Sequence, residues 1–413
     1  MHHQRELCAQ QEASLEGAPA SLSRIFQIWS DEVKECGACA LWALAGNHPE
    51  QQRAIAERIG TSQIIDMLLI KSDTLHLIGC QAVAAWGWKS SSSQSRLSRD
   101  NTIPPLIRLL RLERSTRKVV MATLDALNNM CIGVAHINNK QTQLLIAEEG
   151  AIELLLNRVW RTSRDETMQV CLLHYLACLV SGCQENEEKL NDLDGFGFEI
   201  ILEILNSANL SVKFQAASAL AVFAFNRLQQ QQRISRLGGL NLTTFEDLFR
   251  CNDPGHVTGA AFQLVVLARV VTSLPLVEAS ARGVILLVNA LDDVRDEVVV
   301  MAADYLASLA HTRAGVPDAI VTCEAVPKLL EKLNSSDKLL RQSAAQALGY
   351  LSFNRTASRE LMAACRATEG VHSNLTVNLG EDGRISDEFV AEFKRQATIG
   401  LPIANNKKRI SRP

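Results

Sequence analysis

The residues with the greatest potential for chemistry are cysteines and histidines, and they occur in two local groups. Cys36 and Cys39 form a C-x-x-C pair, whereas Cys171, His174 and Cys178 follow one another at helical spacing. The C-x-x-C pair falls inside a predicted helix and has no second pair at zinc-finger spacing, which disfavours a redox or zinc site. Three ligands on one helix diverge along about 10 Å of axis, which disfavours tetrahedral coordination. We therefore predict no metal ion and no cofactor.

No familiar catalytic motif is present. The sequence lacks G-x-S-x-G, P-loop, H-E-x-x-H and G-x-G-x-x-G patterns. The carboxylate pairs Asp292–Asp293 and Glu187–Glu188 fall at predicted helix caps and polar loops, where they are expected to face water. We predict that the protein is not an enzyme and takes no small-molecule substrate.

Composition favours a folded, all-helical chain. The 413 residues are 47% hydrophobic but only 5% aromatic, and they include just 10 prolines. A net charge of −3 excludes the strongly basic balance of a typical nucleic-acid-binding protein. The 11 cysteines are an odd number and lie in apolar stretches, as is typical of reduced thiols, so we expect a cytoplasmic location, with the nucleus as a further compartment.

No segment is expected to enter or cross a membrane. The N-terminus has no apolar core of the kind found in signal peptides. The most apolar stretch runs from Pro254 to Val277, and its charge-free part of 15 residues is shorter than the roughly 18 residues that a spanning helix needs. We predict a buried helix there.

Apolar segments of similar pattern recur along the chain. Their central residues are Leu41, Val83, Leu127, Leu176, Leu220, Leu264, Leu306 and Leu348, with successive gaps of 42, 44, 49, 44, 44, 42 and 42 residues. Upstream of each lies a residue suited to a turn, in order Gly17, Gly60, Asn101, Gly150, Gly195, Gly238, Gly283 and Glu324. A period of this length predicts stacked helical repeats.

Each repeat has the same predicted order of elements. A short polar helix ends at the turn residue, and a second helix with one apolar face begins at once, as in TIPPLIRLL at 102–110. A polar break then caps a longer third helix, which is apolar almost all round and is therefore expected to be buried between neighbouring repeats.

These features resemble the armadillo-repeat family. The segments at 102–110 and 125–131 (DALNNMC) are close to its consensus, and the likeness extends over about residues 1–354. The stretch 347–396 resembles the carboxyl end of proteins that combine ankyrin and armadillo repeats. The resemblance implies a right-handed α-solenoid of about eight repeats with a decayed ninth.

The predicted domain organisation is a solenoid over residues 1–379, followed by a helical extension and a basic disordered tail over 380–413. The repeats are expected near 1–48, 49–88, 89–132, 133–183, 184–226, 227–271, 272–312 and 313–354, with a partial repeat at 355–379.

The resemblance places function on the concave surface formed by the third helices. Positions two residues before the central apolar residue are Cys39, Gln81, Asp125, His174, Ser218, Phe262, Asp304 and Gln346. Positions two residues after it are Ala43, Ala85, Asn129, Cys178, Val222, Val266, Ser308 and Tyr350. These sixteen positions include no Lys or Arg, so they predict a neutral to mildly acidic groove.

We predict a non-enzymatic protein–protein interaction scaffold that holds a polar or mildly basic peptide in this groove. The candidate partner-binding residues are Gln81, Asp125, Asn129, His174, Ser218, Asp304 and Gln346. Two alternatives stay open. One is a nuclear-transport-type cargo adaptor, although the ladder of Asn and Trp that this role implies is mostly absent. The other is a passive fragment of a larger ankyrin/armadillo protein, since the chain opens inside a repeat, with residues 5–16 as its first helix.

Three irregular segments are further candidates for function. The 49-residue gap comes from about four extra residues near 132–139 (IGVAHINN), and insertions in repeat proteins often serve binding, although tolerated loop lengthening explains this one too. Residues 89–101 (KSSSSQSRLSRDN) are expected to be mobile and open to phosphorylation, with a frayed helix as the alternative. The basic tail between Lys407 and Arg412 is expected to be disordered, with a localisation signal as the alternative.

Overall fold

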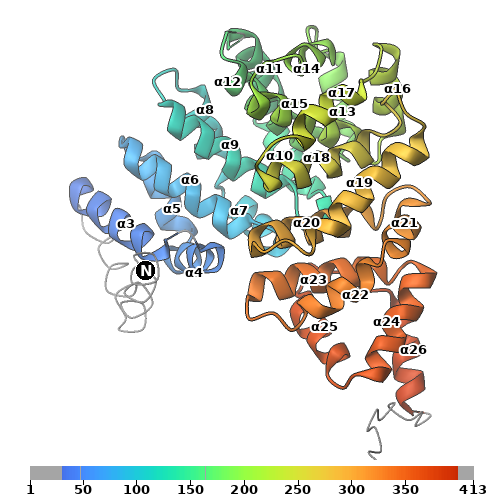
Figure 1. The fold of residues 1–413 in the computed structure, drawn as a ribbon. Helices are drawn as coiled ribbons and strands as arrows, with labels where there is room; N and C mark the ends of the chain where they lie inside the picture. The colour runs from blue at the N-terminus through green and yellow to red at the C-terminus, as the bar shows by residue number, and fades with distance from the viewer. Residues whose placement is uncertain (1–29, 47, 163, 399–413) are drawn as a thin grey trace, which may run out of the picture. The chain divides into compact units, whose positions relative to one another are not determined.

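The computed structural model describes residues 30–46, 48–162 and 164–398, and their secondary structure is helical (Figure 1). These ranges contain 24 α-helices, one 3-10 helix and no β-strand. The predicted all-α solenoid fold is therefore confirmed. The predictions for residues 5–16, Gly17 and the basic tail lie outside the described residues.

The chain divides into two compact units. The first comprises Met1–Gly133 and Asn138–Gly197, and the second comprises Val134–Ile137 and Phe198–Pro413. The first contains α3 (Asp31–Ala45), α4 (Pro49–Ile59), α5 (Thr61–Leu69), α6 (Asp73–Gly87), α7 (Ser91–Arg99), α8 (Ile103–Arg111), α9 (Arg117–Cys131), α10 (Lys140–Glu148), α11 (Ala151–Arg161), α12 (Glu166–Val180) and α13 (Gln184–Asp192).

The second unit contains η2 (Val134–His136), α14 (Glu199–Ile204), α15 (Leu210–Ala224), α16 (Leu228–Arg236), α17 (Leu242–Phe249), α18 (Pro254–Leu267), α19 (Leu276–Ala290), α20 (Asp296–Leu309), α21 (Val316–Thr322), α22 (Ala325–Lys332), α23 (Lys338–Leu351), α24 (Arg355–Ala367), α25 (Val371–Leu379) and α26 (Asp387–Thr398).

The long third helices form the core of each unit by packing on one another. In the first unit α3 packs on α6, α6 on α9 and α9 on α12. In the second unit α15 packs on α18, α18 on α20 and α20 on α23. The central apolar residues predicted from the sequence, from Leu41 to Leu348, are all at most 1% exposed. Burial of one such residue in each third helix holds neighbouring repeats together.

The α18 region illustrates this burial. The helix is 14 residues long, and ten of its residues, from Thr258 to Leu267, are buried. The prediction of a buried helix is therefore confirmed for 254–267, whereas the rest of the apolar stretch leaves this helix and leads into α19. Among the described residues no helix combines the length and the apolar character needed to cross a membrane.

The predicted turn residues have a left-handed backbone at six of the seven positions that the structure describes. Their φ angles are 82° at Gly60, 66° at Asn101, 76° at Gly150, 97° at Gly195, 103° at Gly238 and 63° at Glu324. Glu324 adopts this conformation without being glycine because the start of α22 requires the same turn there as in the other repeats.

Gly283 is the exception, and the predicted turn at this position is wrong. It lies in the middle of α19, a continuous 15-residue helix that replaces the first and second helices of its repeat. A Cβ atom at Gly283 would lie 2.5 Å from Val265 Cγ2 and 2.7 Å from the carbonyl oxygen of Ala261. Glycine is needed here because α19 approaches the backbone of α18 closely.

The substitution Gly283→Ala tests this close approach. Alanine favours a helix interior by about 1 kcal/mol relative to glycine, but the clash with α18 should outweigh that gain. We expect a net loss of about 1–3 kcal/mol in the free energy of unfolding, measured by urea denaturation. The matched control is Gly255→Ala on α18, where the new Cβ meets nothing closer than 3.4 Å. A more stable Gly283→Ala protein would contradict the argument.

Buried amide side chains of the first helices satisfy the carbonyl groups at the ends of the third helices. Gln94 Nε2 donates to the carbonyls of Gly87 (3.1 Å) and Asn129 (2.8 Å). Gln143 Nε2 donates to the carbonyls of Cys178 (2.7 Å) and Ser181 (2.9 Å).

The same arrangement recurs in both units. Asn186 Nδ2 donates to the carbonyl of Leu179 (2.9 Å), and Gln231 Nε2 donates to that of Ala224 (2.9 Å). Both amide side chains are buried, as are Gln94 and Gln143. The last carbonyls of a helix have no partner within that helix, so the amides add hydrogen bonds at a buried corner. The carbonyls of Gly87 and Ala224 also accept from the backbone N–H groups of Ser90 and Arg227.

Gln143→Leu should therefore destabilise the first unit. The substitution leaves two buried carbonyls without their donor, which costs about 2–4 kcal/mol in the free energy of unfolding. The control is Gln184→Leu on the neighbouring helix α13, where the side chain is exposed and a change within about 0.5 kcal/mol is expected. Equal midpoints for both variants in urea, followed by far-UV circular dichroism, would refute the role of the buried amide.

Candidate functional site

The first unit has an open concave pocket of about 630 Å³ between its third helices. Its lining residues come from α3, α4, α6 and α9. The helix α6 packs on each of the other three, and Figure 1 shows α3, α4 and α6 side by side. The lining residues are Trp42, Pro49, Gln52, Leu77, Gln81, Ala84, Ala85, Trp88, Arg117, Lys118, Met121, Ala122, Asp125 and Asn129.

Three of the predicted partner-binding residues come together in this pocket. Gln81 is on α6, and Asp125 and Asn129 are one helical turn apart on α9. Asn129 Nδ2 donates a hydrogen bond to the carbonyl of Ala84 at 3.2 Å, which fixes the position of its amide group. The floor of the pocket therefore presents a carboxylate and two amides.

The environment of Asp125 favours a cationic ligand. Its side chain has an exposed face, yet the surrounding protein removes enough water to raise the pKa of its carboxyl group. A partly desolvated carboxylate gains more from a nearby cation than a fully hydrated one does. A positively charged side chain entering the pocket would therefore be stabilised at Asp125.

Sequence reasoning missed a basic edge of the pocket. Arg117 and Lys118, in the first turn of α9, are both lining residues. The predicted groove was defined by sixteen positions, two near the centre of each third helix, and the first turn of α9 is not among them. Arg117 also pairs with Asp165 at the start of α12. The pocket is thus mixed in charge, with a single carboxylate on its floor and two cations at one end.

The other predicted residues lie elsewhere. His174 is on α12 and does not line the pocket, and Ser218, Asp304 and Gln346 lie on α15, α20 and α23 of the second unit. All four are half-buried. Their binding of a partner stays a prediction.

The cysteine–histidine group on α12 is shaped by burial. Cys178 Sγ lies 3.7 Å from His174 Nε2. Burial raises the pKa of the Cys178 thiol to about 12 and that of Cys171 to about 11, and it lowers the pKa of His174 to about 4. At neutral pH this group consists of two thiols and a neutral imidazole. Within the part of the chain that the structure describes, no cluster of three or more His, Cys, Asp or Glu side chains is arranged to hold a metal ion.

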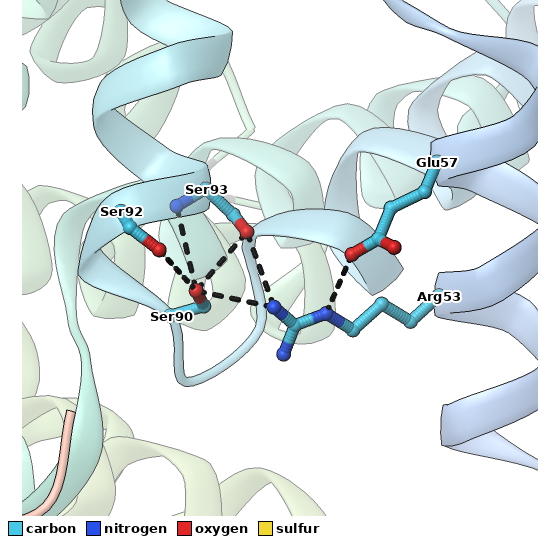
Figure 2. A network of polar contacts seen from close by, with 5 residues as sticks. All are labelled: Arg53, Glu57, Ser90, Ser92 and Ser93. Carbon is cyan, nitrogen blue, oxygen red and sulfur yellow. Dashed lines mark hydrogen bonds and ion pairs between the residues drawn. The ribbon is translucent and has the colours of Figure 1, made fainter. Parts of the chain in front are cut away.

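The serine-rich segment is ordered as a helix, so the expectation of a mobile stretch is wrong. Ser90 caps α7, and Arg53 Nη2 donates to Ser90 Oγ and Ser93 Oγ, both at 3.3 Å (Figure 2). Arg53 Nε donates to Glu57 Oε1 at 3.0 Å. Buried Leu97 holds α7 to the core, while Ser91 and Ser92 are exposed. Phosphorylation of this segment stays a prediction.

The low pKa of His174 makes a testable contribution to stability. Its folded value of about 4 lies below the ordinary value of 6.5, so protons bind more tightly to the unfolded chain. Stability is therefore unaffected above about pH 6.5 and falls as the pH decreases from there toward 4. We expect His174→Leu to remove about 1–3 kcal/mol of this decrease, measured by urea denaturation at several pH values. An unchanged pH dependence in the folded variant would show that His174 does not carry it.

Comparisons with known proteins agree with the repeat pattern. No family model matches the sequence. The mouse (Mus musculus) ankyrin and armadillo repeat-containing protein is 34% identical over 352 residues, which is 85% of this chain and 24% of the relative. The human (Homo sapiens) protein of the same name is 36% identical over 309 residues, 75% of this chain and 22% of the relative. The chain thus spans about a quarter of the length of these relatives.

Among solved structures, an engineered protein superposes with a TM-score of 0.47 at 21% identity, over 92% of each chain. A designed armadillo repeat protein superposes with a TM-score of 0.31 at 16% identity, over 80% of this chain and 98% of its own. The helix triplets of this chain and the sequence relatives identify the repeat fold. These relatives confirm the resemblance predicted from the sequence: over most of its length the chain is similar to ankyrin and armadillo repeat-containing proteins.

Proposed function

We propose that the protein is a non-enzymatic protein–protein interaction scaffold and that its first unit holds an extended partner segment in the concave pocket. The observation that carries this proposal is the convergence of third helices from consecutive repeats on one open pocket. There α3 supplies Trp42, α6 supplies Gln81, and α9 supplies Asp125 and Asn129. Repeat proteins commonly bind partners on such concave surfaces because stacked helices present a continuous row of side chains.

The chemistry of the pocket specifies a polar segment with one basic residue. The aliphatic part of a Lys or Arg side chain would pack against the rings of Trp42 or Trp88, and its charge would reach Asp125. Gln81 and Asn129 offer amide groups to the backbone of an extended peptide. Arg117 and Lys118 would repel a second basic residue at their end of the pocket, so the partner is expected to be only mildly basic.

The cargo-adaptor alternative has one observation in its favour. Asn129 shares the pocket with two tryptophan rings, Trp42 and Trp88. Neither tryptophan occupies the position two residues before the central apolar residue, where the family ladder would place it. A strongly basic peptide would bind under this alternative despite Arg117 and Lys118. The cytoplasmic or nuclear location stays a prediction.

The proposal predicts that partners depend on the pocket floor. We expect the double variant Gln81→Ala/Asp125→Ala to recover its specific partners about tenfold less well than the wild type in proximity labelling, because the carboxylate and one amide are lost. The control variant Gln63→Ala/Asp66→Ala makes the same changes on α5, away from the pocket lining. Circular dichroism verifies that both variants are folded.

Two results would contradict the proposal. A partner set that is unchanged in the folded pocket variant would remove the pocket as the working surface, and it would favour the passive-fragment alternative. A partner set that is lost equally in the control variant would show a general effect of surface mutation.

A further inference from the structure

The insertion at 132–139 contributes four residues to the second compact unit. Val134–Ile137 belong to that unit, although the residues on both sides belong to the first. Val134 and Ala135 are 4% and 7% exposed, so they are buried like core residues. A lengthened surface loop would leave such side chains in water. The segment is therefore held by specific contacts.

Those contacts are made with an aromatic surface formed by Phe225, Phe262, Ser308 and His311. The ring of His136 packs on Phe225 and Phe262, with centroid distances of 5.0 and 5.3 Å. Ser308 Oγ lies 3.4 Å from His136 Nδ1. His311 Nε2 lies 2.7 Å from the carbonyl oxygen of Ala135, to which it donates a hydrogen bond.

These contacts have the form of peptide recognition. One backbone carbonyl is held by a side-chain donor, and one ring is held between aromatic side chains. Phe262 and Ser308 also occupy the positions that the repeat pattern assigns to the concave face, on α18 and α20. The segment thus occupies the surface on which an armadillo-type repeat would hold a partner.

The bound segment has an unfavourable backbone conformation. Ala135 has φ 54° and ψ 36°, and His136 has φ 58°. Residues other than glycine adopt this left-handed conformation only at a cost, which the surrounding contacts must offset. A competing peptide with glycine at the first of these positions would make the same contacts without the cost at that position, although its histidine would still adopt the left-handed conformation.

The surface also extends beyond the segment. A cavity of about 340 Å³ in the second unit is lined by both Phe225 and His311, together with residues such as Arg269 and Arg313. Room next to the occupied surface allows a longer ligand to be held than four residues of the chain itself.

We propose that the aromatic surface is a second peptide-binding site, which the chain's own residues 134–137 occupy until a partner displaces them. The partner is a peptide that presents a glycine followed by histidine in the same turn conformation as residues 135 and 136. This inference rests on the proposed scaffold function, but it concerns a different surface from the pocket of the first unit.

The test uses the full chain and labelled peptides in a fluorescence anisotropy titration. The probe is the peptide IGVAHINN, the sequence of residues 132–139. In the wild type the tethered segment competes at an effective concentration of about millimolar, so weak binding is expected. In the variant His136→Ala the tethered copy loses its ring, and binding at least about tenfold tighter is expected.

Two controls make the result specific. The double variant His136→Ala/His311→Phe keeps a ring at position 311 but removes the donor to the peptide carbonyl, so the gained binding should be lost. The peptide IGVAGINN, which lacks the imidazole, should bind none of the chains at the same concentration.

The backbone strain gives a second, independent measurement. The peptide IGVGHINN should bind the His136→Ala chain roughly fivefold tighter than IGVAHINN does. Conversely, Ala135→Gly in the chain should strengthen the tethered contact, slow hydrogen exchange at residues 134–137 and weaken binding of the free peptide. This variant needs no loss of contacts, so it serves if His136→Ala does not fold.

Equal affinity for wild type and folded His136→Ala, or no binding to either, would overturn the inference and leave the segment as a fixed structural brace. That result is separable from failure of the proposed function, because the partner test for the first unit depends on Gln81 and Asp125. Loss of partners in that test together with no peptide binding here would reject only the second site.

Discussion

The repeats depend on satisfying the backbone where each third helix ends. These ends are buried at the corner between repeats, so their carbonyl groups cannot bond to water. Gln94, Gln143, Asn186 and Gln231 supply the missing donors from first helices. Gln94 also joins the ends of two third helices, α6 and α9, and so fixes them to one another. These hydrogen bonds hold the ends of α6, α9, α12 and α15, the helices that present side chains on the concave face.

The sequence predicts the repeats well because two strong local signals coincide. One apolar residue per third helix must be buried, and one residue before each second helix must turn left-handed. Gly283 shows the limit of this reasoning, since glycine also serves close packing, and the sequence does not distinguish a turn from a contact with α18. The serine-rich segment shows another limit. Its helix α7 is held by the hydrogen bond from Gln94 and by the burial of Leu97. It is also held by the hydrogen bond from Arg53 to Ser90, two residues that are almost a whole repeat apart in the sequence.

The candidate site was predictable in part. Helical spacing predicts that Asp125 and Asn129 share one face of α9, and the repeat pattern assigns Gln81 to the same surface. All three line one pocket because α6 and α9 pack together. Arg117 and Lys118 were not predicted as pocket residues. They line the pocket from the first turn of α9, whereas the predicted groove positions lie near the centre of each third helix. The role of residues 134–137 could not be predicted either. The repeat spacing shows that residues are inserted, but tertiary contacts determine where the inserted residues pack.

The packing of residues 134–137 in the second unit has a consequence for how the chain folds. Most hydrogen bonds between the helices of neighbouring repeats join residues 34 to 49 positions apart, whereas the bonds from His311 and Ser308 to the insertion span 176 and 172 positions. A repeat array built only of near neighbours can grow from either end, because each step closes a short loop. Here one contact closes a loop of several repeats, and it forms only after α18 and α20 are in place. The assembly of an otherwise one-dimensional chain thereby acquires a step that cannot occur until helices more than a hundred residues further along the chain have formed.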